Sequence, residues 1–359
     1  MKVNSTNLSK ALAFLYQAYP NKTTMSIMQN VKFSANQGVL TMTQINGEQE
    51  LTYKIPCSNE QEEFTVEMKK LKDRASQYPK DKDVTITCNE LKATVKCGRS
   101  KITLNAMPSS VFPDTREPSS FDIVRFKGED LKRALSVVKN AQAINDVRDY
   151  FNGVNIEIEC GQCDVVATDG HRLHHYNMSL LEGQEMQRKC IIPKNSIPPI
   201  YKYLDSDNIS IRLSDNSLHI SDEESSIQTQ LLDARYPDWK RIIPQQNPVV
   251  ATFNKVDLEQ AIKGALVASN EKYKGVRLTV SDGLAKFESN APDGSSSEEI
   301  IECAIAGADS VEIAFNGAYV IDAVFAVESE NVDILIKDGS SPALVKDGGY
   351  QAVIMPMRL

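Results

Sequence analysis

One helical phrase occurs three times in this chain, and any fold has to accommodate all three copies. The copies are residues 7–12, 130–135 and 257–262, and each has an Asx residue, then Leu, two polar residues, Ala and an aliphatic residue. The apolar residues stand at i, i+3 and i+4, which places them on one face of a helix. Because the copies begin at residues 7, 130 and 257, we expect a unit of roughly 120 residues used three times.

A second set of similar segments follows in the same order. Residues 84–88, 209–213 and 332–336 are strand-like, and the first two alternate with period two. An aromatic-Pro-Asp sequence stands at residues 112–114 and again at 236–238. The shared order and spacing indicate a triplication. Each unit is then predicted to contain a strand, a helix, several strands, a second helix and further strands.

The predicted helices come in three pairs. They lie near residues 8–19 and 66–78, 128–143 and 196–204, and 256–269 and 317–327, with Asn316 as the N-cap of the last. Composition changes at 108–120 and 244–248, which are predicted linkers. We therefore expect domains at 1–120, 121–247 and 248–359. Short alternating strands with two helices per domain indicate an α+β class, with the helices packed on one face of each sheet.

Composition is that of an ordinary soluble protein, with 41% hydrophobic and 25% charged residues. No apolar signal-peptide core opens the chain and no run reaches the ~18 apolar residues of a membrane span, so we expect a cytoplasmic protein without membrane contact. Seven scattered cysteines argue against a disulfide framework. Cys160 and Cys163 form the one CxxC sequence, and we interpret Gly161-Gln162 between them as a two-residue hairpin turn. Without a second CxxC no zinc site is expected.

Charge is unevenly distributed along the chain. The net charge is −8, yet Lys69, Lys70, Lys72 and Arg74 lie on a predicted helix and Lys80 follows it, while acidic residues gather at 60–63, 222–224 and 298–302. Net charge does not report where charges sit. The basic helices therefore leave two interpretations open, solvated helix faces or a surface for nucleic acid.

Thr168-Asp169-Gly170-His171-Arg172-Leu173 is the most distinctive local string. It contains a carboxylate and an imidazole, so a hydrolase using Asp169 and His171, with or without a metal, is one hypothesis. The other interpretation is a hairpin or bulge at Asp169-Gly170. No helical HExxH, P-loop or nucleophile-elbow motif is present. The last seven residues, Val-Ile-Met-Pro-Met-Arg-Leu, are unusually apolar, and Met suits a groove that accepts varied partners.

Four separated motifs together resemble one family. Residues 167–173, 236–239, Phe315-Asn316 with Tyr319, and 355–359 are similar in kind and order to the bacterial DNA polymerase III beta subunit, the sliding clamp. The resemblance spans the whole chain. It implies three similar clamp domains, each with two helices packed on antiparallel sheet, in a head-to-tail ring dimer that encircles duplex DNA. It implies no catalysis, cofactor or metal.

The resemblance also implies partners and site residues. The expected partners are duplex DNA, a second copy of the chain, the DNA polymerase III alpha subunit, the clamp loader and other clamp-binding-motif proteins. A peptide pocket between the second and third domains is expected to use Phe151, Thr168, Gly170, His171, Arg172, Leu173, Pro237, Arg241, Ile242, Asn316, Tyr319, Val353, Met355, Pro356, Met357 and Arg358. A scaffold that binds protein partners without encircling DNA is a third hypothesis.

Two further surfaces follow from the same resemblance. The residues expected to face DNA are Lys22, Lys69, Lys70, Lys72, Arg133, Lys139 and Asn145. The residues expected at the dimer interface are Arg99, Lys101, Ile102, Leu104, Val267, Ala268, Glu298, Glu299 and Glu302. Phe151, Trp239 and Ala268 depart from the commoner residues of the family, which puts partner preference and ring tightness, more than the fold, in question.

Overall fold

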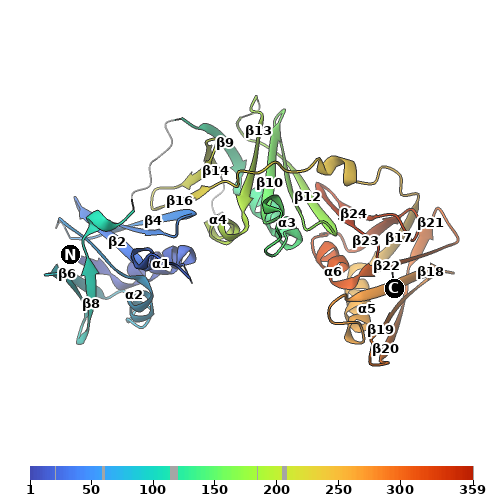
Figure 1. The fold of residues 1–359 in the computed structure, drawn as a ribbon, viewed down its shortest axis with the longest axis horizontal. Coiled ribbons are helices and arrows are strands. Elements are labelled where there is room, and N and C mark those ends of the chain that lie inside the picture. Colours follow the sequence, from blue (N-terminus) through green and yellow to red (C-terminus); the bar gives the residue numbers. More distant parts are fainter. Residues whose placement is uncertain (21, 59–60, 114–119, 184, 204–207, 359) are drawn as a thin grey trace. The chain divides into compact units, whose positions relative to one another are not determined.

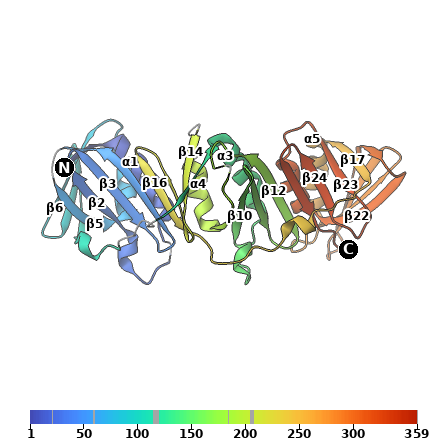
Figure 2. The ribbon, with the colours of Figure 1, turned by 90° about the horizontal axis from the view of Figure 1, so that it is seen from above.

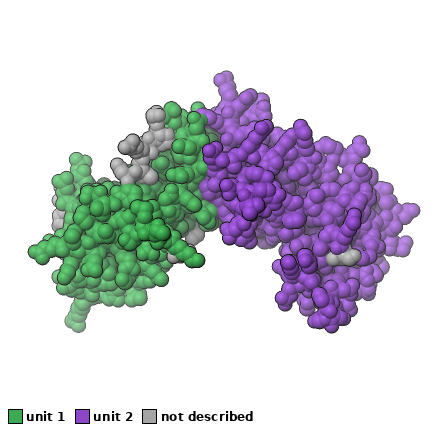
Figure 3. Space-filling view, viewed as in Figure 1, with its two compact units in different colours: residues 1–128, 195–231 green, residues 129–194, 232–359 purple. Residues whose placement is uncertain are grey.

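The computed structural model describes residues 1–20, 22–58, 61–113, 120–183, 185–203 and 208–358. The chain forms two compact units, residues 1–128 with 195–231, and residues 129–194 with 232–359, which are coloured separately in Figure 3. All strand pairs among the described residues are antiparallel, as in β2 with β3 and in β10 with β11. No helix in the described part of the chain is long and apolar enough to cross a membrane.

The elements repeat three times in the predicted order of strand, helix, strands, helix and strands. The first repeat holds β1 (Lys2–Asn4), α1 (Ser5–Leu15), β2 (Asn30–Asn36), β3 (Val39–Ile45), β4 (Gln49–Pro56), β5 (Glu62–Glu67), α2 (Met68–Ala75), β6 (Asp83–Asn89), β7 (Lys92–Cys97) and β8 (Ser100–Met107). The second holds β9 (Asp122–Lys127), α3 (Gly128–Val138), β10 (Gly153–Glu159), β11 (Gln162–Thr168), β12 (Arg172–Ser179), β13 (Arg188–Pro193), α4 (Ile197–Tyr203), β14 (Asn208–Leu213), β15 (Ser217–Ser221) and β16 (Ser225–Gln230). The third holds β17 (Val249–Asn254), α5 (Lys255–Val267), β18 (Gly275–Ser281), β19 (Leu284–Asn290), β20 (Ser296–Glu302), β21 (Ala304–Ala306), β22 (Ser310–Asn316), α6 (Gly317–Phe325), β23 (Asn331–Ile336), β24 (Ala343–Asp347) and β25 (Tyr350–Ile354). The 3₁₀ turns are η1 (Tyr16–Ala18), η2 (Ser26–Gln29), η3 (Ser109–Val111), η4 (Lys139–Ala141), η5 (Asp149–Phe151), η6 (Lys194–Ser196) and η7 (Trp239–Ile242).

The repeated helical phrase forms the buried face of the first helix in every repeat. Leu8, Leu131 and Leu258 are at most 1% exposed, and the Ala and the aliphatic residue that follow each of them are buried as well. Full burial of a Leu side chain contributes about 1.5–3 kcal/mol, so each phrase fixes its helix to a sheet. The prediction of a triplicated, helix-on-sheet architecture is confirmed.

The first unit is organised by one twelve-stranded sheet. Its order is β1-β6-β7-β8-β5-β2-β3-β4-β16-β15-β14-β9, so pairing of β4 with β16 continues the sheet from the first repeat into the second. Figure 2 shows β3, β2 and β5 side by side in this sheet. β8 pairs with β7 at residues 100–105 and with β5 only at Ala106 and Met107. Residues 100–105 of β8 therefore leave one edge open.

The second unit contains two sheets. A nine-stranded sheet runs in the order β13-β10-β11-β12-β25-β24-β23-β17-β21, and a four-stranded sheet runs in the order β20-β19-β18-β22. Figure 1 shows α5 and α6 close together beside the strands of the third repeat, in agreement with their mutual contact. Pairing of β12 with β25 carries the larger sheet from the second repeat into the third. We call this β12–β25 pairing the seam.

Several predicted details differ from the structure. α2 begins at Met68 because Val66 still belongs to β5, where it pairs with Val31. The β10–β11 hairpin turn consists of Cys160 and Gly161, one residue earlier than predicted, because this turn needs positive φ at both positions and they have φ of 51° and 76°. Part of the first predicted linker, residues 114–119, and the predicted helix end at residue 204 lie outside the described residues. The domain boundaries at 120 and 247 stay predictions.

Candidate functional site

The seam brings two distant segments of the chain together. Its register pairs Leu173 with Val353 and Arg172 with Ile354, so the loop before β12 lies beside the tail after β25. The tail is then fixed on both sides. Met355 N donates to the His171 carbonyl over 3.0 Å, and Met357 N donates to the Ala314 carbonyl of β22 over 2.8 Å.

The loop from Thr168 to Arg172 is held by its own side chains. The Thr168 hydroxyl donates to the Arg172 carbonyl (2.6 Å) and accepts from Gly170 N (3.1 Å). Asp169 Oδ1 accepts from His171 N (2.9 Å) and Arg172 N (3.1 Å), which is an Asx turn. Gly170 has φ of 88°, a conformation that favours glycine. The distinctive string therefore encodes a rigid loop.

Beneath the loop and tail lies an apolar floor. Val166, Leu173, Trp239, Leu344 and Val353 form one buried cluster and are each at most 3% exposed. The floor is completed by the partly buried Tyr236, Ile243 and Leu335. Leu173 and Val353, both predicted as pocket residues, thus lie under the surface and support it.

Further predicted pocket residues border this floor. Phe151 is buried, and its ring lies 3.6 Å from where a Cβ on Gly170 would stand. Asn316 caps α6 by accepting from Ala318 N (3.0 Å), which sets the helix that carries Tyr319. The tail residues Met355 and Arg358 are exposed, whereas Pro356 and Met357 are half-buried.

The remaining predicted residues belong to the segment around η7. Pro237 is half-buried and Ile242 is 40% exposed. Arg241 is 85% exposed and pairs with Asp238 over 2.7 Å. The buried residue that anchors this turn is Trp239, whose ring lies 4.6 Å from that of His175 and whose Nε1 donates to Glu157.

Sequence reasoning missed some residues of the site. Arg148 stacks over the Phe151 ring at 4.3 Å and lies beside Gly170, while Asp146 holds it by two hydrogen bonds of 2.9 Å. Tyr236 and Trp239 are in the floor, although from sequence they are only part of a family motif and not predicted pocket residues. The sequence places Arg148 three residues before Phe151. That spacing brings the two side chains together only when the η5 turn between them is formed.

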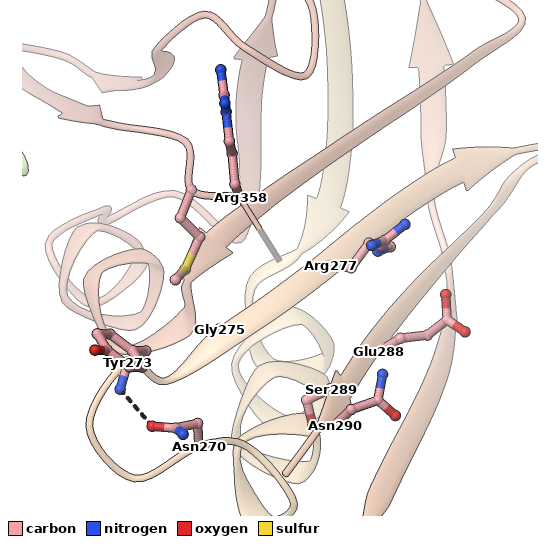
Figure 4. Close-up of a pocket in the computed structure, with 9 residues that line it drawn as sticks. Asn270, Tyr273, Gly275, Arg277, Glu288, Ser289, Asn290 and Arg358 are labelled. Atoms are coloured by element: carbon pink, nitrogen blue, oxygen red, sulfur yellow. Dashed lines mark hydrogen bonds between the residues drawn. The ribbon is translucent and has the colours of Figure 1, made fainter. Parts of the chain in front are cut away.

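A cavity of about 530 Å³ borders the tail on the third repeat. It is lined by Asn270, Tyr273, Gly275, Arg277, Glu288, Ser289, Asn290, Met357 and Arg358. Figure 4 shows these residues on the strands β18 and β19, on the loop before them and on the tail. Two of its charges are engaged within the chain, Arg277 with Glu312 (2.8 Å) and Glu288 with Lys286 (2.9 Å).

The geometry does not provide a hydrolytic centre at Asp169. Both carboxylate oxygens of Asp169 are engaged, one with two backbone N–H groups and the other with Arg172 Nε at 3.2 Å. His171 lies in the loop before β12, with an exposed side chain. Within the described ranges no three His, Cys, Asp or Glu residues are grouped closely enough to hold a metal ion.

Two buried histidines next to His171 have structural partners. His174 Nδ1 lies 2.8 Å from the Val137 carbonyl and 3.2 Å from the Tyr350 hydroxyl, and complete burial lowers the pKa of His174 to about 4. His175 Nε2 lies 2.8 Å from Asp164. Burial alone would raise the pKa of Asp164, but hydrogen bonds from His175 and Asn177 outweigh it and hold that pKa well below its usual range.

The predicted DNA-facing residues fall in both units and differ in their partners. In the first unit Lys22 and Lys69 are exposed, Lys70 pairs with Glu67, and Lys72 lies 4.4 Å from the Tyr16 ring centroid. In the second unit Lys139 and Asn145 are exposed. Arg133 instead pairs with Glu328 (3.0 Å) and donates to the Ala326 carbonyl at the end of α6.

The predicted dimer residues lie on strands with open edges and on one helix end. Ile102 and Leu104 share a face of β8, and Arg99 stands in the turn before it. β20 is an edge strand on which Glu298 and Glu302 are exposed, whereas Glu299 faces Gly264 of α5. Val267 is 87% exposed at the end of α5, followed by Ala268.

The chain matches known proteins over its whole length. Models of the N-terminal, central and C-terminal domains of the DNA polymerase III beta subunit match residues 1–116, 125–238 and 240–358. The beta sliding clamp of Pseudomonas aeruginosa is 31% identical over 364 residues, 98% of each chain. That of Escherichia coli is 30% identical over 366 residues, 99% of each chain. This chain belongs to the DNA polymerase III beta subunit family.

Solved structures agree with this assignment. The crystal structure of the DNA polymerase III subunit beta from Pseudomonas aeruginosa has a TM-score of 0.95 at 29% identity, covering 100% of both chains. A sliding clamp from the same species, crystallised with griselimycin bound, has a TM-score of 0.95 at 28% identity over 100% of this chain and 99% of that one. The chain is thus a DNA sliding clamp, a processivity factor in DNA replication and not an enzyme. The hydrolase and scaffold hypotheses are not supported.

The buried His174 makes the stability of this clamp depend on pH. Above pH 6.5 the His174 imidazole is neutral in both the folded and the unfolded chain. Between pH 6.5 and 4 only the unfolded chain binds the proton, so the free energy of unfolding falls as pH falls, by about 1.4 kcal/mol per pH unit. Between pH 7 and pH 5 the loss attributable to His174 is about 2 kcal/mol.

We expect His174→Gln to remove that part of the difference in unfolding free energy between pH 7 and pH 5. Denaturant unfolding at both pH values measures it. His171→Gln, at an exposed histidine of the same segment, is the control and should leave the difference unchanged. An identical pH dependence in His174→Gln and the unsubstituted chain would contradict the prediction.

Proposed function

We propose that the surface formed by the 168–172 loop, the tail and α6 acts as a groove that binds short linear peptides of the DNA polymerase III alpha subunit, the clamp loader and other clamp-binding-motif proteins. The observation that supports it is the seam, which joins the loop to the tail over an apolar floor. A cytoplasmic location goes with this role.

The chemistry of the groove suits an apolar anchor on a peptide. Leu173 and Val353 belong to the apolar floor and Phe151 borders it. The half-buried Met357 supplies a flexible side of the kind that accepts Leu or Phe. Binding energy in such a groove concentrates in one or two buried anchors. Partners have to exchange, so we expect micromolar affinity, about 8 kcal/mol.

Met357→Ala tests the groove. Removing this side chain should weaken binding of a labelled polymerase peptide by about 1–2 kcal/mol, measured by fluorescence anisotropy, with little loss of stability. The matched control is Met25→Ala, because Met25 is an exposed methionine of the first unit, 49% accessible, and outside the groove. If the peptide binds Met357→Ala as tightly as the unsubstituted chain, the groove assignment fails.

We further propose that the ring closes by pairing β8 of one copy with β20 of another. Both strands have an open edge, and an open edge is prone to pair with another chain. On β8, Ile102 and Leu104 would pack near Val267 and Ala268, and Arg99 and Lys101 would meet Glu298 and Glu302. Glu299 faces its own helix, which makes it the weakest member of the predicted set. Two such contacts related by a two-fold axis close a head-to-tail dimer.

Ile102→Asp should produce monomers, because it would place an unpaired charge in the apolar part of this interface. Sedimentation at micromolar concentration measures the change. Ile123→Asp is the control, since Ile123 is an exposed strand residue of β9, 49% accessible, outside the proposed contact. A monomeric unsubstituted chain, or an intact Ile102→Asp dimer, would contradict the proposed ring closure.

Within the ring, we propose that Lys22, Lys69, Lys70, Lys72, Lys139 and Asn145 face duplex DNA, with Arg133 the least supported of the set because its guanidinium is engaged by Glu328 and Ala326. Such contacts go to phosphates, so they are independent of sequence, permit sliding and weaken steeply with salt.

Reversing Lys69, Lys70 and Lys72 to Glu should shorten residence on circular DNA while the dimer stays intact. Reversing the exposed Lys54, Lys337 and Lys346 to Glu is the control, because it changes the net charge by the same amount. Retention on nicked circular DNA at low and high salt is the measurement. Equal retention of both triple variants would contradict the assignment.

A further inference from the structure

All three nitrogens of the Arg172 guanidinium are engaged inside the chain. Its Nε lies 3.2 Å from Asp169 Oδ2, its Nη1 donates to the Asp322 carboxylate, and its Nη2 donates to the Asn140 carbonyl. Its side chain is 10% exposed. A carboxylate on a bound peptide that used these same N–H groups would have to displace one of these partners. The charged end of Arg172 is therefore a structural group, although Arg172 borders the groove.

Asp322 joins this guanidinium to the helix that carries Tyr319. Tyr319 and Asp322 stand three residues apart on α6, which places them on one face. The Asp322 carboxylate bonds Arg172 and accepts from Asn140 Nδ2 (3.4 Å), while the Arg172 guanidinium stacks on the Tyr319 ring with its carbon 4.3 Å from the centroid. Asp322, Arg172 and Tyr319 thus form a chain of contacts that ends at the groove.

We infer that Asp322 is a positioning residue of the peptide groove, an inference that rests on the proposed function. Asp322 fixes the plane of the Arg172 guanidinium, and that plane fixes the Tyr319 ring by stacking. The wall made by Tyr319 is then formed before a peptide arrives. Preorganisation of this kind strengthens binding by removing the cost of ordering side chains during association.

The alternative is that Asp322 only stabilises the contact between the second and third repeats. The chain contains a natural comparison for that role. Arg133 of α3 pairs with Glu328, just after α6, over 3.0 Å. That ion pair joins the same two parts of the chain, yet neither residue is among the contacts of Arg172 or Tyr319. Glu328→Gln is therefore the matched control for Asp322→Asn.

The experiment measures the affinity of a labelled polymerase peptide for Asp322→Asn and for Glu328→Gln by fluorescence anisotropy, in the full-length chain. We expect Asp322→Asn to weaken binding by about five-fold or more, and Glu328→Gln by less than about two-fold. In an Arg172→Ala background, Asp322→Asn should have no further effect, because the contact it acts through is gone. A general loss of stability would not produce that dependence.

The outcomes separate this inference from the proposed function. If the unsubstituted chain does not bind the peptide, the proposed function fails. If it binds and Met357→Ala weakens it, but Asp322→Asn binds like the unsubstituted chain, only the positioning role is overturned. Equal losses in Asp322→Asn and Glu328→Gln would overturn it as well.

Folding of each variant is checked by the fluorescence of Trp239, the single tryptophan of the chain. Should Asp322→Asn fail to fold, Asn140→Ala provides the test. It removes the side-chain bond to Asp322 and leaves the backbone carbonyl that Arg172 uses. A smaller loss of affinity in the same direction supports the inference, and an unchanged affinity overturns it.

Discussion

The backbone ladder between β12 and β25 is the interaction on which the candidate site depends. Five register pairs, from Arg172 with Ile354 to Tyr176 with Tyr350, make one sheet out of strands from two repeats. Left unpaired, each strand would expose a row of backbone donors and acceptors. Because the ladder satisfies them, the loop before β12 and the tail after β25 have fixed positions relative to each other. The hydrogen-bond geometry of the ladder therefore fixes the two walls of the candidate groove more tightly than packing of two separate surfaces would.

Buried polar groups around the seam favour this one register. His174 links the Val137 carbonyl of α3 to the Tyr350 hydroxyl of β25, and all three groups are shielded from water. A shift of one residue would turn His174 toward the other face and leave buried polar groups without partners, which is costly in a low-dielectric interior. His175, on the opposite face, meets Asp164 under Trp239. The adjacent residues His174 and His175 therefore make buried polar contacts on opposite faces of β12, and both contacts favour the observed register.

Local and periodic features of the fold could be predicted from sequence, and long-range features could not. The i, i+3, i+4 phrase identifies α1, α3 and α5 because helix amphipathicity is read within one turn. The 168–173 string indicates the position of the candidate site through family resemblance, yet its residues alone allowed catalysis as well. Only the structure shows that Asp169 is used by backbone N–H groups and Arg172. Arg148, Asp322 and Asn140 join the site through contacts between segments far apart in the sequence, and no local pattern encodes such contacts.

Two of the three departures from the commoner family residues, Phe151 and Trp239, fall in the buried part of the candidate site. Phe151 and Trp239 are 6% and 3% exposed, and each is fixed by neighbours, Phe151 by Arg148 and Gly170 and Trp239 by His175 and Glu157. A larger side chain in a close-packed floor has to be accommodated by its surroundings. The exposed residues of the candidate site, among them His171, Arg241 and Met355, are not constrained by packing in this way. Under the proposed function, a change in the shape of the floor changes which peptide anchor fits while the exposed residues still present the same polar groups, so we expect related clamps to differ in peptide preference without loss of the fold.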